Sequence, residues 1–160
     1  MKIGVVLITY AIDVTPLIKS MDGPDVSWRI FTHSANQEVI AALNFIPVRS
    51  DMRPDIKLYD YRQNRGLAKS WNEGLIDAYA MGADAVIIAN DDIVATYDDL
   101  MVLANAAQQN RDYGVVVCEG QNLRMNEHQN LQFAILAINP LALETIWYFD
   151  ESFTPIYFED

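Results

Sequence analysis

Residues 85–93 read Ala85-Val86-Ile87-Ile88-Ala89-Asn90-Asp91-Asp92-Ile93, and this stretch decides the fold of the chain. Its apolar, β-branched part is typical of a strand buried on both faces, as in parallel sheets covered by helices. The strand ends in an amide and two carboxylates, Asn90, Asp91 and Asp92. Because open α/β sheets bind ligands beyond the carboxyl ends of their strands, we expect these three residues at the functional edge of the sheet.

The paired carboxylates suggest a metal ion. Two carboxylates about 4 Å apart repel each other by roughly 4 kcal/mol at an effective dielectric constant of about 20, and a divalent cation relieves that repulsion. Mg²⁺ is commonly held by one or two carboxylates together with substrate phosphates. The pattern therefore favours a metal-assisted nucleotide-sugar site with Asp91 and Asp92 as metal ligands. The alternative is that Asp92 caps a turn and Asp91 points into water.

Length and charge restrict the possible partners. A chain of 160 residues suits one domain, residues 1–160, and its 51% hydrophobic content is enough for a core. The net charge is −11, and lysine and arginine form no cluster. This disfavours nucleic acid as the main partner, because neutralisation of phosphates dominates that kind of binding. A small anionic ligand is still compatible with this net negative charge if a metal ion and a few local cations bind it.

The single cysteine, Cys118, follows an apolar run of valines and is expected to be a small core residue. It has no partner for an internal disulfide. The chain shows neither a basic and apolar leader nor an apolar stretch of about 18 residues, so no transmembrane segment is predicted. These features favour a reducing cytoplasmic location.

Short apolar runs alternate with amphipathic segments, which predicts βα units and a Rossmann-like α/β fold with a mostly parallel sheet covered by helices. The expected strands cover residues 3–9, 27–32, 56–59, 85–89, 113–118 and 131–138. The expected helices cover residues 15–21, with Thr15 as N-cap, then 36–43, 66–81, a helix capped by Thr96 that runs to 109, and 140–147. Trp71 and Leu75 are assigned to the core, and Asn72 is expected to hydrogen-bond within the fold.

Four segments strengthen the functional prediction because of their order in the chain. They are Val5–Tyr10, Asn64–Leu75, Gly82–Asp92, and Phe149–Phe153 with Tyr157–Asp160. Together they resemble the GT-A glycosyltransferases of the family 2 type, which use nucleotide-diphosphate sugars. The resemblance implies a GT-A fold, Mn²⁺ or Mg²⁺ as cofactor, and inverting transfer of a sugar from the donor to an acceptor hydroxyl.

Several residues then become candidates for binding the nucleotide sugar. Thr9 and Tyr10 end the first strand, where a base or ribose would lie; alternatively, Tyr10 is a core residue at the boundary. Gly66 opens a helix whose N-terminus favours phosphate, and Arg65 and Lys69 are the best-placed cations for a diphosphate. The alternatives are an ordinary turn glycine and two solvated surface charges.

The resemblance also assigns roles to the acidic turn and to the end of the second strand. It implies that Asp91 contacts the ribose or the metal and that Asp92 binds the metal bridging the diphosphate. Asn90 stands where the family has the first aspartate of its metal motif, and it retains a carbonyl oxygen as a possible ligand. His33 and Ser34 stand where the family usually has an aspartate that recognises the base. They either substitute for it, or His33 is structural.

The end of the chain, Glu159-Asp160, resembles the segment that carries the general base of inverting members. Asp160, or else Glu159, would take the proton of the acceptor hydroxyl. Family members continue beyond this pair, so the chain is expected to be truncated at its C-terminus, to be completed by a partner chain or a homo-oligomer, or to have lost activity. The last case predicts a nucleotide-binding or interaction module of the same fold without turnover.

Overall fold

The computed structural model describes residues 1–10, 12–34, 37–44, 55–117, 134–145 and 148–152. Strands and helices alternate along most of this part of the chain, which confirms the predicted βα units. In order they are β1 (Ile3–Thr9), α1 (Thr15–Met21), β2 (Val26–Thr32), α2 (Gln37–Asn44), β3 (Ile56–Asp60), α3 (Leu67–Ala80), β4 (Ala85–Asn90), α4 (Tyr97–Gln109), β5 (Val115–Val117), β6 (Ile135–Ile138) and α5 (Pro140–Thr145).

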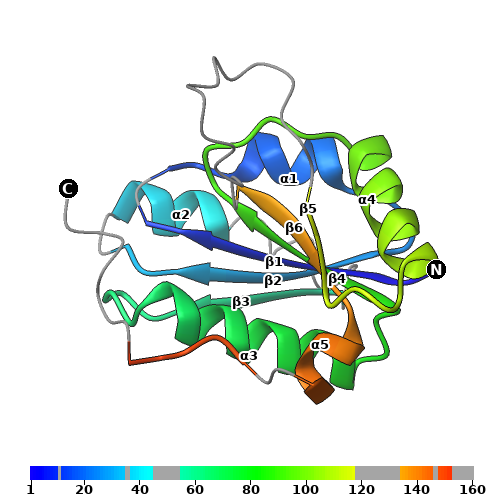
Figure 1. Cartoon of the computed structure of the whole chain (residues 1–160). Coiled ribbons are helices and arrows are strands. Elements are labelled where there is room, and N and C mark those ends of the chain that lie inside the picture. Colours follow the sequence, from blue (N-terminus) through cyan, green and yellow to red (C-terminus); the bar gives the residue numbers. More distant parts are fainter. Residues whose placement is uncertain (11, 35–36, 45–54, 118–133, 146–147, 153–160) are drawn as a thin grey trace, which may run out of the picture.

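The strands form one six-stranded sheet in the order β3-β2-β1-β4-β6-β5. The first four strands along the chain are parallel, and β6 runs antiparallel to both of its neighbours, β4 and β5. Helices α1 and α4 cover one face, and α3 and α5 cover the other (Figure 1). Every residue of β1 is buried, as expected of a central strand between two helical layers. The predicted α/β fold with a mostly parallel sheet is therefore confirmed.

Two glycines let α3 lie close to the sheet. A Cβ atom on Gly74 would lie 2.5 Å from Cγ1 of Val6, and one on Gly4 would lie 2.7 Å from the Cβ of Ala78. Neither position has room for a larger side chain, because real Cβ atoms essentially never approach so closely. The distance between α3 and β1 is therefore set where each glycine meets a side chain of the other element, Val6 or Ala78.

The predicted helix caps have different outcomes. Thr96 caps α4 in a capping box with Asp99, as expected. The prediction that Thr15 caps α1 is wrong: Val14 is the N-cap residue, without a side-chain cap, and Thr15 is already helical. The sequence signal was misleading because the carboxylate of Asp13 accepts the bond from the Thr15 backbone N–H at 2.9 Å.

The strands predicted for residues 113–118 and 131–138, which correspond to β5 and β6, begin later in the sequence than predicted. Residues 113 and 114 precede β5, which begins at Val115, and Cys118 lies outside the described residues. The strand predicted for residues 131–138 is β6, which begins at Ile135, while residues 131–133 lie outside the described part. None of the described helices is both long and apolar enough to span a lipid bilayer.

Candidate functional site

The carboxyl ends of the four parallel strands meet at one edge of the sheet, which we call the rim. The register places Thr9 opposite Thr32, Thr32 opposite Asp60, and Ile8 opposite Asn90. The residues just beyond the strands continue this alignment, since the N–H of His33 donates to the carbonyl of Thr9 at 3.0 Å. Side chains that are far apart in the sequence are therefore held side by side at the rim.

The acidic turn after β4 has one sheltered carboxylate and one exposed carboxylate. Asp91 is half-buried and Asp92 is exposed. Burial raises the pKa of Asp91 above its usual value, and the charge of Asp92 raises it further. The Thr9 hydroxyl and the Tyr10 backbone N–H act in the opposite direction. Asp91 is therefore turned toward the end of β1, which does not agree with the alternative in which it points into water.

The oxygen atoms of this turn suit a hard divalent cation. Asp91 and Asp92 offer carboxylates, and the half-buried Asn90 offers an amide oxygen. No group of three or more Asp, Glu, His or Cys side chains suited to a metal occurs in the described part of the chain. A phosphate or water can supply the remaining ligands of a cation at the rim, as is common for Mg²⁺.

His33 and Ser34 follow β2 and are both buried. The Nε2 atom of His33 lies 2.8 Å from the Oγ of Ser70 on α3, while its Nδ1 is buried without a hydrogen-bond partner in the described residues. Burial lowers the pKa of His33, and the charge of Arg65 lowers it further. His33 is therefore neutral near neutral pH, because a buried imidazolium is disfavoured. The backbone N–H of Ser34 donates to Oγ1 of Thr32 at 3.3 Å.

Gly66 is the N-cap of α3 and has a backbone conformation that favours glycine, with φ 85° and ψ 145°. Its N–H donates to Oδ1 of Asn64 at 2.9 Å. Lys69, in the first turn of the helix, is half-buried. The predicted helix start at Gly66 thus matches the N-cap, and the glycine has a definite backbone requirement at this position.

Arg65 is not an isolated surface charge. Its guanidinium lies 4.1 Å from the ring centroid of Tyr61, and one of its nitrogens lies 3.7 Å from a carboxylate oxygen of Glu73. The Tyr61 hydroxyl donates to the same carboxylate, and the pKa of Tyr61 is raised to about 12 by burial and by Glu73. Glu73 therefore partly offsets the positive charge that Arg65 would present to a diphosphate.

Our sequence analysis did not identify Tyr61, Ser70 and Glu73. One signal was present, because Tyr61 lies two residues beyond the strand predicted for residues 56–59, while Tyr10 and His33 immediately follow their predicted strands. Ser70 and Glu73 lie three residues apart on a helix, which places them on neighbouring positions of one face.

The predicted residues at the end of β1 differ in exposure. Tyr10 is 48% exposed, so it is not a core residue. Thr9 is buried and its hydroxyl donates to the carbonyl of Ile12 at 2.9 Å.

The predicted internal role of Asn72 is confirmed, since its carboxamide bonds to the backbone of Phe149. Leu75 is fully buried, as predicted, and Trp71 packs against the core beneath α3. The two candidates for a general base, Glu159 and Asp160, lie outside the described residues.

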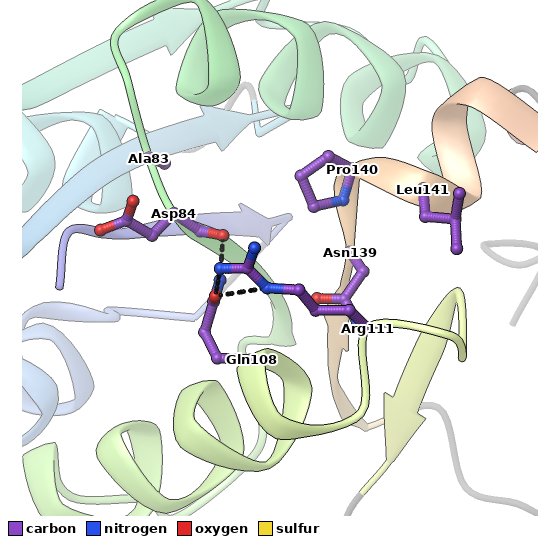
Figure 2. A pocket seen from close by; sticks show the side chains of 7 residues that line it. All are labelled: Ala83, Asp84, Gln108, Arg111, Asn139, Pro140 and Leu141. Atoms are coloured by element: carbon purple, nitrogen blue, oxygen red, sulfur yellow. Dashed lines mark hydrogen bonds between the residues drawn. The ribbon is translucent and has the colours of Figure 1, made fainter.

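A cavity of about 290 Å³ lies at the end of the sheet opposite the rim, beside the amino end of β4 (Figure 2). It is lined by Ala83, Asp84, Gln108, Arg111, Asn139, Pro140 and Leu141. The Nδ2 of the buried Asn139 donates to the carbonyls of Ala107 and Tyr113, at 3.0 and 2.9 Å. Asn139 therefore joins the end of α4 to the start of β5, and this cavity contains none of the predicted site residues.

Comparison with known proteins identifies the fold. No family model and no curated protein sequence matches this chain. Among solved structures, the mannosyltransferase PcManGT from Pyrobaculum calidifontis, in complex with GDP-Man and Mn²⁺, matches with a TM-score of 0.68 and 20% sequence identity. TarS from S. aureus, residues 1–349, matches with a TM-score of 0.62 and 17% identity. A CMP:2-keto-3-deoxy-manno-octonic acid synthetase complexed with CTP matches with a TM-score of 0.51 and 13% identity.

The matches cover nearly the whole chain. They include 94% of it for the mannosyltransferase and for TarS, and 91% for the synthetase. The chain spans 48% of the mannosyltransferase, 51% of TarS and 77% of the synthetase. The fold is therefore the GT-A fold of nucleotide-sugar transferases, as the sequence resemblance implied.

Proposed function

We propose that this chain is the donor-binding domain of a glycosyltransferase, which takes a sugar from a nucleotide-diphosphate donor and transfers it to an acceptor hydroxyl. The fold supports this proposal, because one similar structure is a mannosyltransferase in complex with GDP-Man and Mn²⁺, and another, TarS, has been solved in complex with UDP. The single observation that carries it is the rim: an acidic turn, a glycine-opened helix and a buried neutral histidine converge where open α/β sheets bind ligands.

In this proposal, the ends of β1 and β2 bind the nucleoside. The exposed ring of Tyr10 offers a stacking surface, and the polar residues Thr9, His33 and Ser34 lie at the same strand ends. The N-terminus of α3 favours the diphosphate, together with Arg65, Gly66 and Lys69. These two groups of residues lie at one rim and can therefore bind the two halves of one donor.

Asn90, Asp91 and Asp92 would hold the metal ion, Mn²⁺ or Mg²⁺, with Asp92 as the accessible ligand. A metal ion bound here would act as a Lewis acid that stabilises the negative charge of the departing nucleoside diphosphate. The protein itself also positions this turn, because the carboxylate of Asp91 accepts a hydrogen bond from the backbone N–H of Tyr10 at the end of β1.

Transfer would proceed by one displacement at the anomeric carbon, with inversion. The carboxylate of Asp160, or else Glu159, removes the proton of the acceptor hydroxyl, and the oxygen attacks the anomeric carbon. The bond from that carbon to the phosphate oxygen breaks, and the nucleoside diphosphate leaves with the electron pair. A general base of this kind contributes about 10²–10⁴-fold to the rate.

A thermal-shift screen tests the proposal most directly. A nucleoside diphosphate at about 100 times its Kd stabilises the protein by about 2.7 kcal/mol, which raises the Tm by roughly 5–10 °C. We expect one of UDP, GDP, TDP or CDP to do so, and more strongly with Mn²⁺. No shift with any of the four, with or without the metal, would contradict the proposal. Binding without release of sugar from any donor would identify a nucleotide-binding module instead.

A further inference from the structure

Asn72 uses its whole carboxamide to hold a distant segment of the chain. Its Oδ1 accepts a hydrogen bond from the backbone N–H of Phe149 at 2.9 Å. Its Nδ2 donates to the carbonyl of Phe149 at 2.9 Å and to Oε1 of Glu151 at 3.0 Å. The side chain therefore pairs with both backbone groups of one residue, as a neighbouring β-strand would, and it is only 4% exposed.

A second contact holds the same segment. The rings of Trp71 and Phe149 lie 4.9 Å apart between centroids at an angle of 53°, a tilted arrangement that aromatic pairs favour. Phe149 is half-buried against the core on the α3 face of the sheet. Residues 148–152 accordingly lie beside α3 in Figure 1, where they are drawn in red. Two consecutive residues of α3 thus fix this segment, one by hydrogen bonds and the other by packing.

The same part of α3 contacts the residues that we assign to the donor. Ser70 lies against His33, and Glu73 lies against Arg65 and Tyr61. Asn72 stands between Ser70 and Glu73 in the sequence. One stretch of α3 therefore contacts both the donor side of the rim and the segment 149–151.

We infer that Asn72 is a positioning residue, which fixes the segment 149–151 relative to the bound donor. This inference rests on the proposed function. Asn72 does not itself bind the donor, because both ends of its buried carboxamide are bonded within the chain. It acts through the segment that it holds, so its loss affects the chemical step and not the affinity for the nucleotide.

The test compares Asn72→Ala with the wild-type chain in two measurements. In the first, steady-state release of the nucleoside diphosphate, we expect kcat to fall about 10²-fold, the effect of a misplacement of roughly 1 Å. The KM for the donor and the Kd for the nucleoside diphosphate stay unchanged. Asn72→Asp keeps the acceptor for the Phe149 N–H but loses the donor and faces Glu151, so we expect its kcat to fall as well. Asn105→Ala, an exposed position in the middle of α4, is the matched control and leaves kcat unchanged.

The second measurement does not depend on activity. Amide hydrogen exchange at Phe149 is expected to accelerate in Asn72→Ala, while exchange in β1 and β4 stays slow and shows that the fold is intact. Unchanged exchange at Phe149, or faster exchange with an unchanged kcat, would overturn the inference while the proposed function stands. If the wild-type chain binds no nucleotide, the proposed function fails and the inference falls with it.

Discussion

The Nε2 atom of His33 lies 2.8 Å from the Oγ of Ser70, and this contact joins the end of β2 to helix α3 across the rim. Both side chains are buried. The other ring nitrogen of His33 has no hydrogen-bond partner in the described part of the protein. A proton added to this ring would therefore place a charge in a sheltered position, close to Arg65.

The lowered pKa of His33 predicts a loss of stability in mild acid. The unfolded chain takes up a proton near pH 6.5 and the folded chain does so only at lower pH, so the free energy of unfolding falls as the pH drops below about 6.5. The slope is at most about 1.4 kcal/mol per pH unit. Urea unfolding between about pH 8 and pH 5.5 measures it, a range that lies above the ordinary carboxylate values.

His33→Gln is expected to remove this slope, and His128→Gln, the control at the other histidine of the chain, is expected to keep it. If His33→Gln and the wild type lose stability in parallel, the slope has another origin.

The pKa shift of Asp91 predicts the opposite change of stability with pH. Because burial raises its pKa, the ionised carboxylate opposes folding once the pH is above the value of the unfolded chain, about 3.9. Asp91→Asn keeps the size and one oxygen acceptor without the charge, so it should raise the Tm in metal-free buffer near pH 7. Asp91→Ala removes the acceptor and should cost about 1–3 kcal/mol.

Thermal unfolding at several pH values measures both Asp91 variants. The advantage of Asp91→Asn should grow as the pH rises through the folded pKa of Asp91. Asp92→Asn, at the exposed neighbour, should stay within about 0.5 kcal/mol of the wild type. A Tm for Asp91→Asn as low as that of Asp91→Ala would contradict the assigned cause.

The metal role of Asp92 is tested by Asp92→Ala. We expect this variant to fold normally, because the side chain is exposed, and to lose the part of the nucleotide-induced Tm shift that depends on Mn²⁺. That part is expected to be several degrees under the conditions of the screen above. Asp112→Asn, an exposed aspartate that follows α4, is the matched control and should keep the full shift. The same shift in both variants would mean that Asp92 does not bind the metal.

Gly66→Ala should cost about 1–3 kcal/mol, because φ 85° with ψ 145° is strained for any residue with a Cβ atom. It should also weaken nucleotide binding, since this residue begins the helix that would face the diphosphate. Gly82→Ala is the matched control: Gly82 also has a positive φ, 83°, and no atom lies within 4 Å of the added Cβ position. Calorimetry on both variants separates the two effects, and equal nucleotide affinities would show that Gly66 serves the backbone alone.

Gly74→Ala should destabilise the protein by about 1–3 kcal/mol, although alanine in a helix normally gains about 1 kcal/mol over glycine. The reason is the Cβ position 2.5 Å from Val6, which forces α3 away from the sheet. Urea unfolding measures the change, with Asn105→Ala as a control in an exposed helix position. A stability gain in Gly74→Ala would show that the helix and the sheet are not in close contact.

The strand ends could be predicted from the sequence because they depend on local composition. A run such as Val86 to Ala89 requires burial on both faces, so Asn90 and the two aspartates had to emerge at the rim. Likewise, the strong pattern of α3 and its flanking glycines predicted that helix to within one residue at each end.

The contacts across the rim could not be predicted in the same way. The pairing of His33 with Ser70, and of Arg65 with Tyr61 and Glu73, depends on how α3 is rotated over the sheet, which no spacing rule reveals. The cap of α1 was misplaced for a related reason: Asp13 and Thr15 are both good capping residues, but the backbone conformation makes Val14, which lies between them, the N-cap.

The close approach of α3 to β1 has a consequence for changing what this protein binds. Gly4 in β1 and Gly74 in α3 let the sheet and the helix meet closely, so the position of the helix depends on these contacts and not on the side chains at positions 65 and 69. Substitutions at these two positions can therefore be screened for altered nucleotide preference as a small library, without repacking the interior.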